Sequence, residues 1–113
     1  MSYVSEIIFK ASSIVAENIF LYKRYFILSL VWRFKGFPKK LGKNICSKSI
    51  AGEILIGRKV CVGPHVNIDC CKGAKIKIGE NVSINQGTFI VAREEVNIGS
   101  NVLIGEYCSI RDN

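Results

Sequence analysis

The sequence of 113 residues predicts an all-β solenoid of parallel hexapeptide repeats, preceded by an N-terminal α-helical segment. Three observations lead to this fold class: a repeat that aligns without gaps, an aliphatic residue at every sixth position within it, and an opening stretch without glycine or proline. Internal repeats are considered first because they determine the architecture of a whole chain. The expected organisation is a helical segment over residues 1–40 and a solenoid over residues 41–113, incomplete at its C-terminal end.

The opening segment is rich in bulky apolar residues and is expected to be helical. Ser2 or Ser5 supplies a candidate N-cap, and Gly36 followed by Pro38 supplies stop signals. Because apolar residues cover more than one face of this helix, it is expected to bury more than one side.

Polar pairs at residues 17–18 and 23–24 interrupt this segment. They argue against a transmembrane span, which needs about 20 uninterrupted apolar residues. A signal peptide is also not expected, since no basic start and small-residue cleavage site frame an apolar core. Two interpretations remain: the helix caps the open end of the solenoid, or residues 5–40 lie on the inner face of the cytoplasmic membrane.

The repeat occupies residues 54–68, 76–90 and 96–110, and a fainter copy begins at Leu41. A period of six fits neither an amphipathic helix nor a hairpin, but it suits a short strand and a turn on each side of a triangular prism. Inward-facing residues then stack on their counterparts about 4.8 Å away. The expected core is Ile56, Val62, Ile68, Ile78, Ile84, Ile90, Ile98, Ile104 and Ile110.

Glycines and polar insertions mark the expected corners of the prism. Gly57, Gly79 and Gly99 share one column, which suits corners that need a positive φ or a close backbone approach. Corresponding residues lie 22 and then 20 positions apart, whereas three hexapeptides need 18. The surplus falls in residues 70–75 and 93–95, so longer turns are expected to protrude at one corner.

The chain is basic, with a formal net charge of +7, and much of the excess lies in residues 23–48. A basic stretch suits nucleic acid, anionic lipid or an anionic ligand. Since no signature of a nucleic-acid-binding fold accompanies it, no nucleic-acid partner is expected.

Five cysteines are present, an odd number without a C-x-x-C motif. This is neither a disulfide framework nor a zinc pattern, so no metal is expected, and free thiols suit a reducing cytoplasm. No base is placed to activate a cysteine as a nucleophile. Cys108 shares a column with Val66 and Thr88 and is expected to fill a small core site.

The stretch "IGENVSINQGTFIVAREEVNIGSNVLIGEYCSIRDN" resembles the hexapeptide-repeat acyltransferases, in particular the O-acetyltransferases of bacterial surface polysaccharides, including colanic acid, and the maltose and galactoside acetyltransferases. The resemblance covers residues 41–113. It implies a left-handed β-helix, acetyl-CoA as acyl donor, a sugar or glycan acceptor and a cytoplasmic homotrimer with active sites between subunits.

One motif extends the resemblance to the acceptor-binding site of these enzymes. The segment "ANFNLTIVDD" of the galactoside enzymes aligns on Ile84 to Arg93 without a gap, and Asn85 then matches the acceptor-binding asparagine. The second asparagine of the motif falls on Gly87, a departure that puts the particular sugar in doubt. The alternative interpretation makes Asn85 a corner residue in a left-handed or turn conformation.

The resemblance also implies a catalytic histidine, four or five residues after the core aliphatic Ile110. That position lies one or two residues beyond Asn113, so the chain is expected to be the N-terminal part of a longer enzyme and inactive by itself. His65, the single histidine, shares a column with Gly87 and Tyr107 and is expected to be a surface turn residue. The alternative function is a non-catalytic β-helical structural or oligomerisation module.

Overall fold

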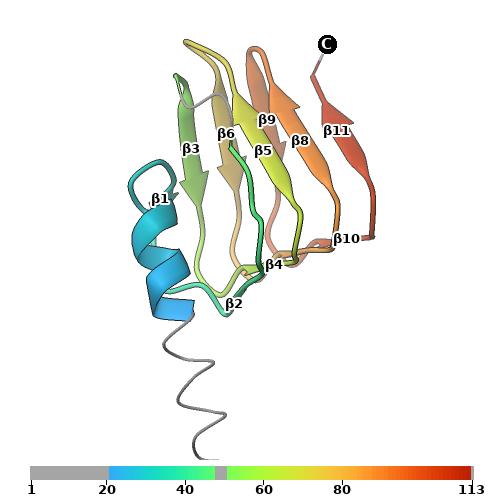
Figure 1. Cartoon of the computed structure of the whole chain (residues 1–113). Helices are drawn as coiled ribbons and strands as arrows, with labels where there is room; N and C mark the ends of the chain where they lie inside the picture. The colour runs from blue at the N-terminus through green and yellow to red at the C-terminus, as the bar shows by residue number, and fades with distance from the viewer. Residues whose placement is uncertain (1–20, 48–50, 113) are drawn as a thin grey trace, which may run out of the picture.

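The chain winds into a parallel β-solenoid with one short helix at its N-terminal side (Figure 1). A computed structural model describes residues 21–47 and 51–112. The predicted class, a parallel solenoid preceded by a helix, is confirmed. The expected helix start at Ser2 or Ser5 lies outside the described residues, as does Asn113. No helix within the described part of the chain is long and apolar enough to cross a membrane.

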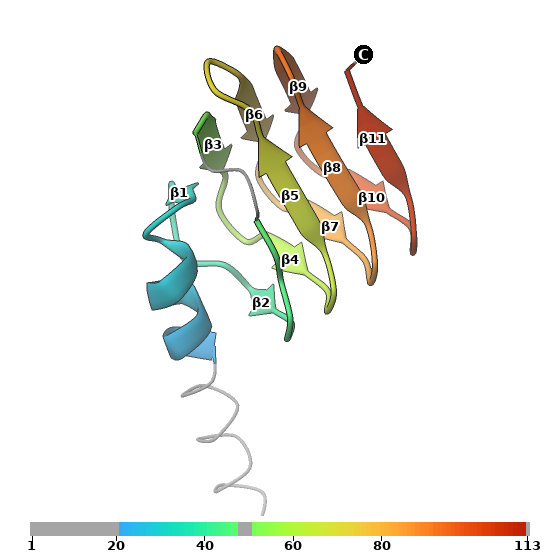
Figure 2. The same cartoon turned by 45° about the horizontal axis from the view of Figure 1, so that its top comes forward.

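Three parallel sheets form the sides of the solenoid, and successive coils contribute one strand to each sheet in turn, except that the first coil meets the third sheet only through an isolated bridge between Cys46 and Asn67 (Figure 2). The first sheet has the order β1 (Arg33–Phe34), β3 (Glu53–Ile56), β6 (Lys75–Ile78) and β9 (Glu95–Ile98). The second has the order β2 (Lys40–Leu41), β4 (Cys61–Val62), β7 (Ser83–Ile84) and β10 (Leu103–Ile104). The third has the order β5 (Asn67–Cys70), β8 (Phe89–Ala92) and β11 (Ser109–Arg111).

The register of the sheets confirms the repeat alignment. Ile84 pairs with Val62 on one side and with Ile104 on the other, and the columns of the other two sheets match in the same way. The fainter copy is also in register, because Leu41 pairs with Val62. The aliphatic residues that recur every six positions therefore stack on their counterparts in the next coil, which is the contact that the period predicted.

The core follows the predicted columns, with a difference at the last coil. Seven of the nine expected core residues are buried, namely Ile56, Val62, Ile68, Ile78, Ile84, Ile90 and Ile104. Ile98 and Ile110 are half-buried, because β9 and β11 are edge strands of their sheets. Cys108, expected to be in the core, is likewise only half-buried in this coil, whereas Val66 and Thr88 in its column are fully buried.

The helix ends earlier than its stop signals predicted. Helical residues run to position 28 rather than to Gly36, and a turn leads into β1. Phe34 pairs with Ile56, and Trp32 is completely buried against the solenoid. The expectation of a helix up to Gly36 is therefore wrong: burying Trp32 and adding a strand to the first sheet outweigh the local helix preference. The first sheet accordingly begins at Arg33, upstream of residue 41.

The column of glycines is explained by close approach rather than by a positive φ. A Cβ atom on Gly57 would lie 2.5 Å from the carbonyl oxygen of Gly79, and one on Gly79 would lie 2.6 Å from the amide nitrogen of Ser100. Positive φ values occur two residues later, at non-glycine positions such as Lys59 and Asn81. The coils therefore need glycine where their backbones stack, while the neighbouring turns impose a left-handed residue of another type.

The extra residues lie where the sequence predicted them, at the corner between the third and the first sheet, but they lengthen the strands and not the turns: residues 71–74 join β5 to β6, and residues 93–94 join β8 to β9. The second of these connections is held by Asp112, whose carboxylate accepts hydrogen bonds from the backbone N–H groups of Arg93, Glu94 and Glu95 at 2.9, 2.7 and 2.8 Å. These hydrogen bonds, with that from Arg93 contributing most, lower the pKa of the Asp112 carboxyl from its ordinary value of 3.8. A charged carboxylate at this position therefore ties the end of the chain to this corner.

This geometry predicts a pH-dependent effect of Asp112→Asn. A carboxyl with a lowered folded-state pKa stabilises the fold fully above its ordinary pKa, and the contribution is lost as pH falls through the lowered value. Asp112→Asn is thus expected to reduce the free energy of unfolding at pH 7 and to have little effect at about pH 2. Urea unfolding at both pH values measures this, with the exposed Glu106→Gln as control. An equal loss at both pH values would contradict a role for the charge.

Candidate functional site

The candidate site is the corner that joins β7 to β8. After Ile84 ends β7, residues 85–88 form a turn in which the N–H of Thr88 donates to the carbonyl oxygen of Asn85 at 3.4 Å. The N–H of Asn85 donates to the carbonyl oxygen of Ile104 in the next coil at 3.1 Å. The backbone of Asn85 is therefore held by both its own turn and the following coil, which fixes the position of its side chain.

Asn85 is a turn residue, but it does not adopt the left-handed conformation. The positive φ of this turn belongs to Gly87, at +71°. The alternative interpretation, a corner residue in a left-handed or turn conformation, therefore holds in its turn form, and asparagine is a common turn residue.

The side-chain amide of Asn85 is not paired with another described residue. Asn85 is half-buried, and its amide group makes no hydrogen bond to any described residue. In the register of the second sheet, its counterparts in the neighbouring coils are Gly63 and Gly105, which have no side chains. The partly desolvated amide of Asn85, with one donor group and one acceptor oxygen, therefore has no side chain above or below it in the sheet. Binding a polar partner would give this amide the hydrogen bonds that it lacks.

Tyr107, in the next coil, approaches the backbone of Gly87, two residues after Asn85. Its ring lies over Gly87, where a Cβ atom would come within 2.4 Å of two ring carbons, and its hydroxyl is 3.0 Å from Nε2 of Gln86. An asparagine at position 87 would tolerate the positive φ, but its Cβ would require the exposed Tyr107 ring to shift. Glycine, at this departure from the galactoside motif, suits both the positive φ and the position of the ring. Residues 20 apart along the chain meet here, which the repeat spacing indicates once the copies are aligned.

His65 lies at the same corner, one coil before Asn85. The carbonyl oxygen of its neighbour Pro64 accepts a hydrogen bond from the N–H of Gly87 at 3.1 Å. His65 is exposed, with a φ of +58°, and its own N–H donates to the carbonyl oxygen of Lys43 at 3.0 Å. It is thus a surface turn residue, as expected from the sequence, although the fold brings it to the side of the prism that carries Asn85.

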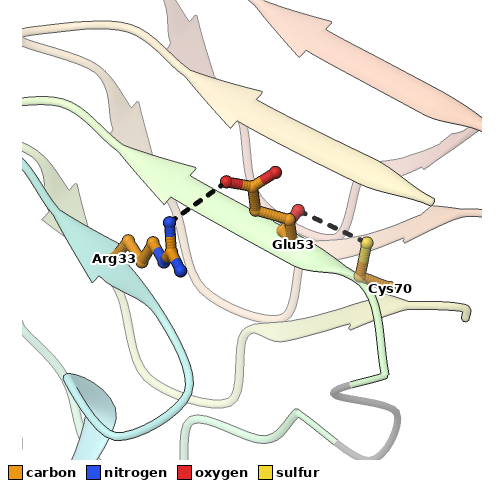
Figure 3. A network of polar contacts seen from close by, with 3 residues as sticks. All are labelled: Arg33, Glu53 and Cys70. Carbon is orange, nitrogen blue, oxygen red and sulfur yellow. Dashed lines mark hydrogen bonds and ion pairs between the residues drawn. The ribbon is translucent and has the colours of Figure 1, made fainter. Parts of the chain in front are cut away.

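Cys70 is a poor candidate for a nucleophile. None of the five cysteines forms a disulfide: Cys46, Cys61, Cys70, Cys71 and Cys108. Cys70 is buried, and its thiol donates to the carbonyl oxygen of Glu53 at 3.5 Å, while the Glu53 carboxylate pairs with Arg33 (Figure 3). Burial, followed by the neighbouring Cys71, raises the pKa of the Cys70 thiol. A thiol in this environment stays protonated and is a poor nucleophile.

Within residues 21–47 and 51–112, no three His, Cys, Asp or Glu side chains lie together as potential ligands of a metal ion. Polar chemistry at the candidate site therefore rests on the amides of Asn85 and Gln86 and on the hydroxyl of Tyr107.

Comparisons of the chain with family models, with curated proteins and with solved structures find no match.

Proposed function

We propose that this chain provides the acceptor-binding part of an acetyl-CoA-dependent O-acetyltransferase that acts on a sugar or a surface polysaccharide. The observation that carries the proposal is the half-buried Asn85 amide, which has no hydrogen-bond partner among the described residues and stands at a rigid corner of a hexapeptide solenoid. The position matches the acceptor-binding asparagine of the family that the sequence resembles. A left-handed coil and a cytoplasmic homotrimer, with sites between subunits, belong to the same proposal.

The chemistry assigns a limited role to this corner. In the proposed reaction, an acceptor hydroxyl attacks the thioester carbonyl of acetyl-CoA, the thiol of coenzyme A leaves, and a base takes the hydroxyl proton. The Asn85 amide is suited to orient the acceptor, because its oxygen accepts from one hydroxyl and its NH₂ donates to another. In the family that the sequence resembles, this base is a histidine.

Asn85→Ala is expected to weaken sugar binding about five- to tenfold, since one hydrogen bond contributes roughly 1 kcal/mol. Acetyl-CoA binding should not change, because Asn85 is proposed to contact only the acceptor. Titration of a sugar panel, followed by amide chemical shifts, measures the first effect, and calorimetry with acetyl-CoA measures the second. Asn97→Ala is a suitable control, since Asn97 is exposed on β9 and bonds only to Glu95 in the same strand. If the Asn85→Ala variant bound the sugars as tightly as the parent chain, Asn85 would not be part of an acceptor site.

Thiol release from acetyl-CoA with the same sugars tests the reaction. The 113 residues alone are expected to show no transfer, because loss of a general base costs about 10²–10⁴-fold. Turnover by the chain would instead place the base within it, and His65→Gln would be the first variant to examine. Absence of sugar binding would favour a structural module.

A further inference from the structure

The short helix over residues 21–28 carries large apolar side chains on its solvent side. Tyr22, Phe26 and Ile27 are 59%, 68% and 53% exposed, and Leu30 in the following turn is 74% exposed. A surface helix of a folded domain normally presents polar residues on this side. Scattered exposed apolar residues need no explanation, but four large ones within nine residues mark a binding surface.

The opposite side of the helix is already packed against the solenoid. Leu28 is buried in the core, and the Tyr25 ring contacts the rings of Phe34 and Phe37, with centroids 5.1 and 4.6 Å apart. Figure 1 shows the helix beside β1, at the end of the solenoid away from β11. The solenoid thus uses one side of the helix, and on the other side the Tyr22 ring contacts the exposed ring of Phe37, with centroids 5.1 Å apart.

The same end of the molecule carries the positive charge of the chain. Residues 21–47 contain seven lysines and arginines and no aspartate or glutamate, while the remaining nine basic residues are balanced by the nine acidic ones. Arg24 and Arg33 are engaged, by the carbonyl oxygen of Leu41 and by Glu53 respectively. The other five are exposed lysines: Lys23, Lys35, Lys39, Lys40 and Lys43.

We propose that this basic aromatic end, defined by the four exposed apolar residues and the five exposed lysines, docks the protein on the surface of an anionic lipid bilayer. Apolar side chains of an interfacial helix enter the boundary between headgroups and acyl chains, and each nearby lysine adds an attraction to anionic lipid. This surface offers both the apolar side chains and the lysines that such docking needs. The inference does not rest on the proposed transferase activity.

Two other occupants fit the surface less well. A second copy of the same surface would place five lysines opposite five lysines, and like charges across an interface are unfavourable. A nucleic acid would use the lysines and stack on Tyr22 or Phe26, but it offers no partner to Ile27 and Leu30. A bilayer satisfies the charges and the aliphatic groups together.

Vesicle co-sedimentation tests the proposal. The 113-residue chain is expected to bind vesicles of phosphatidylcholine with phosphatidylglycerol, to bind pure phosphatidylcholine vesicles at least tenfold less, and to bind less as salt is raised. Phe26→Ser with Leu30→Ser, and separately Lys39→Glu with Lys40→Glu, are each expected to weaken binding about tenfold or more. The single tryptophan, Trp32, is fully buried, so its unchanged emission shows that each variant is folded.

Matched controls separate this surface from general exposure or charge. Leu103→Ser removes a leucine that is 75% exposed on the last coil, and Lys72→Glu with Lys77→Glu reverses two exposed lysines elsewhere. These variants should bind vesicles as the parent chain does. Equal losses in the controls would overturn the proposal. Unchanged vesicle binding by the Phe26→Ser, Leu30→Ser variant would also overturn it, because binding would then depend on charge alone. A shift of this variant from dimer to monomer in sedimentation velocity would overturn it as well, because the occupant of the surface would then be a second copy of the chain.

Discussion

Replacing Ile84 by aspartate is expected to abolish the folded state of the chain. Ile84 is 1% exposed and lies in the second sheet between Val62 and Ile104, so a carboxylate there would have neither water nor a charge partner. The cost is several kcal/mol even after the group takes up a proton. Because small domains are stable by only about 5–15 kcal/mol, little folded protein should remain. Circular dichroism and Trp32 emission measure the loss.

Leu103→Asp is the control for this change, because Leu103 precedes Ile104, the residue that pairs with Ile84 in the next coil. Leu103 pairs with Ser83 beside Ile84, but its side chain is 75% exposed. Leu103→Asp adds the same group at the same level of the sheet and is expected to change the free energy of unfolding by about 0.5 kcal/mol or less. Cooperative urea unfolding of Ile84→Asp with the parent midpoint would contradict the inward column.

Gly57→Ala is the second change with a large expected effect. The added Cβ would lie 2.5 Å from the carbonyl oxygen of Gly79 and 2.8 Å from the amide nitrogen of Glu80, which are backbone atoms of the next coil. No side chain is available to move aside, so the stacked coils must separate at this corner and weaken their ladder hydrogen bonds. Overpacking costs typically 1–3 kcal/mol, and a loss of about 3 kcal/mol in urea unfolding is expected here.

Gly99→Ala makes the same substitution in the same column and serves as the control. A Cβ atom on Gly99 meets nothing within 4 Å in this chain. The change is therefore expected to be neutral or to stabilise the fold by about 0.4–1 kcal/mol through the unfolded state. Similar losses for Gly57→Ala and Gly99→Ala would indicate that backbone conformation, and not the approach of successive coils, selects glycine in this column.

Asn85 shows how far the candidate site was predictable. A gapless motif alignment was sufficient to select the residue, because one short segment contains the whole pattern. The close approach of the Tyr107 ring to Gly87 was not predictable in the same way, because it joins residues of two successive coils. Gln86 and Tyr107 were not selected either, although their side chains meet at this corner.

The sequence by itself determined the repeat, the inward columns and the corner at which the extra residues of each coil lie. Each of these features follows from the chemistry of single residues at a fixed period, since an aliphatic residue must be buried and a polar insertion must stay outside. Its prediction of the helix failed at residue 28 because helix signals are local, whereas Trp32 and Phe34 gain more from the solenoid that forms beside them.

Only the tertiary structure decided which groups meet across successive coils. The carboxylate of Asp112 reaches the turn at Arg93, the backbone of Gly57 approaches that of Gly79, and the helix leaves Phe26 exposed above a basic coil. The first two contacts join residues about 20 positions apart through the stacking distance of parallel strands. The physical reason is that the energy of each contact depends on the distance between two segments in space. The spacing of residues along one strand does not contain this distance.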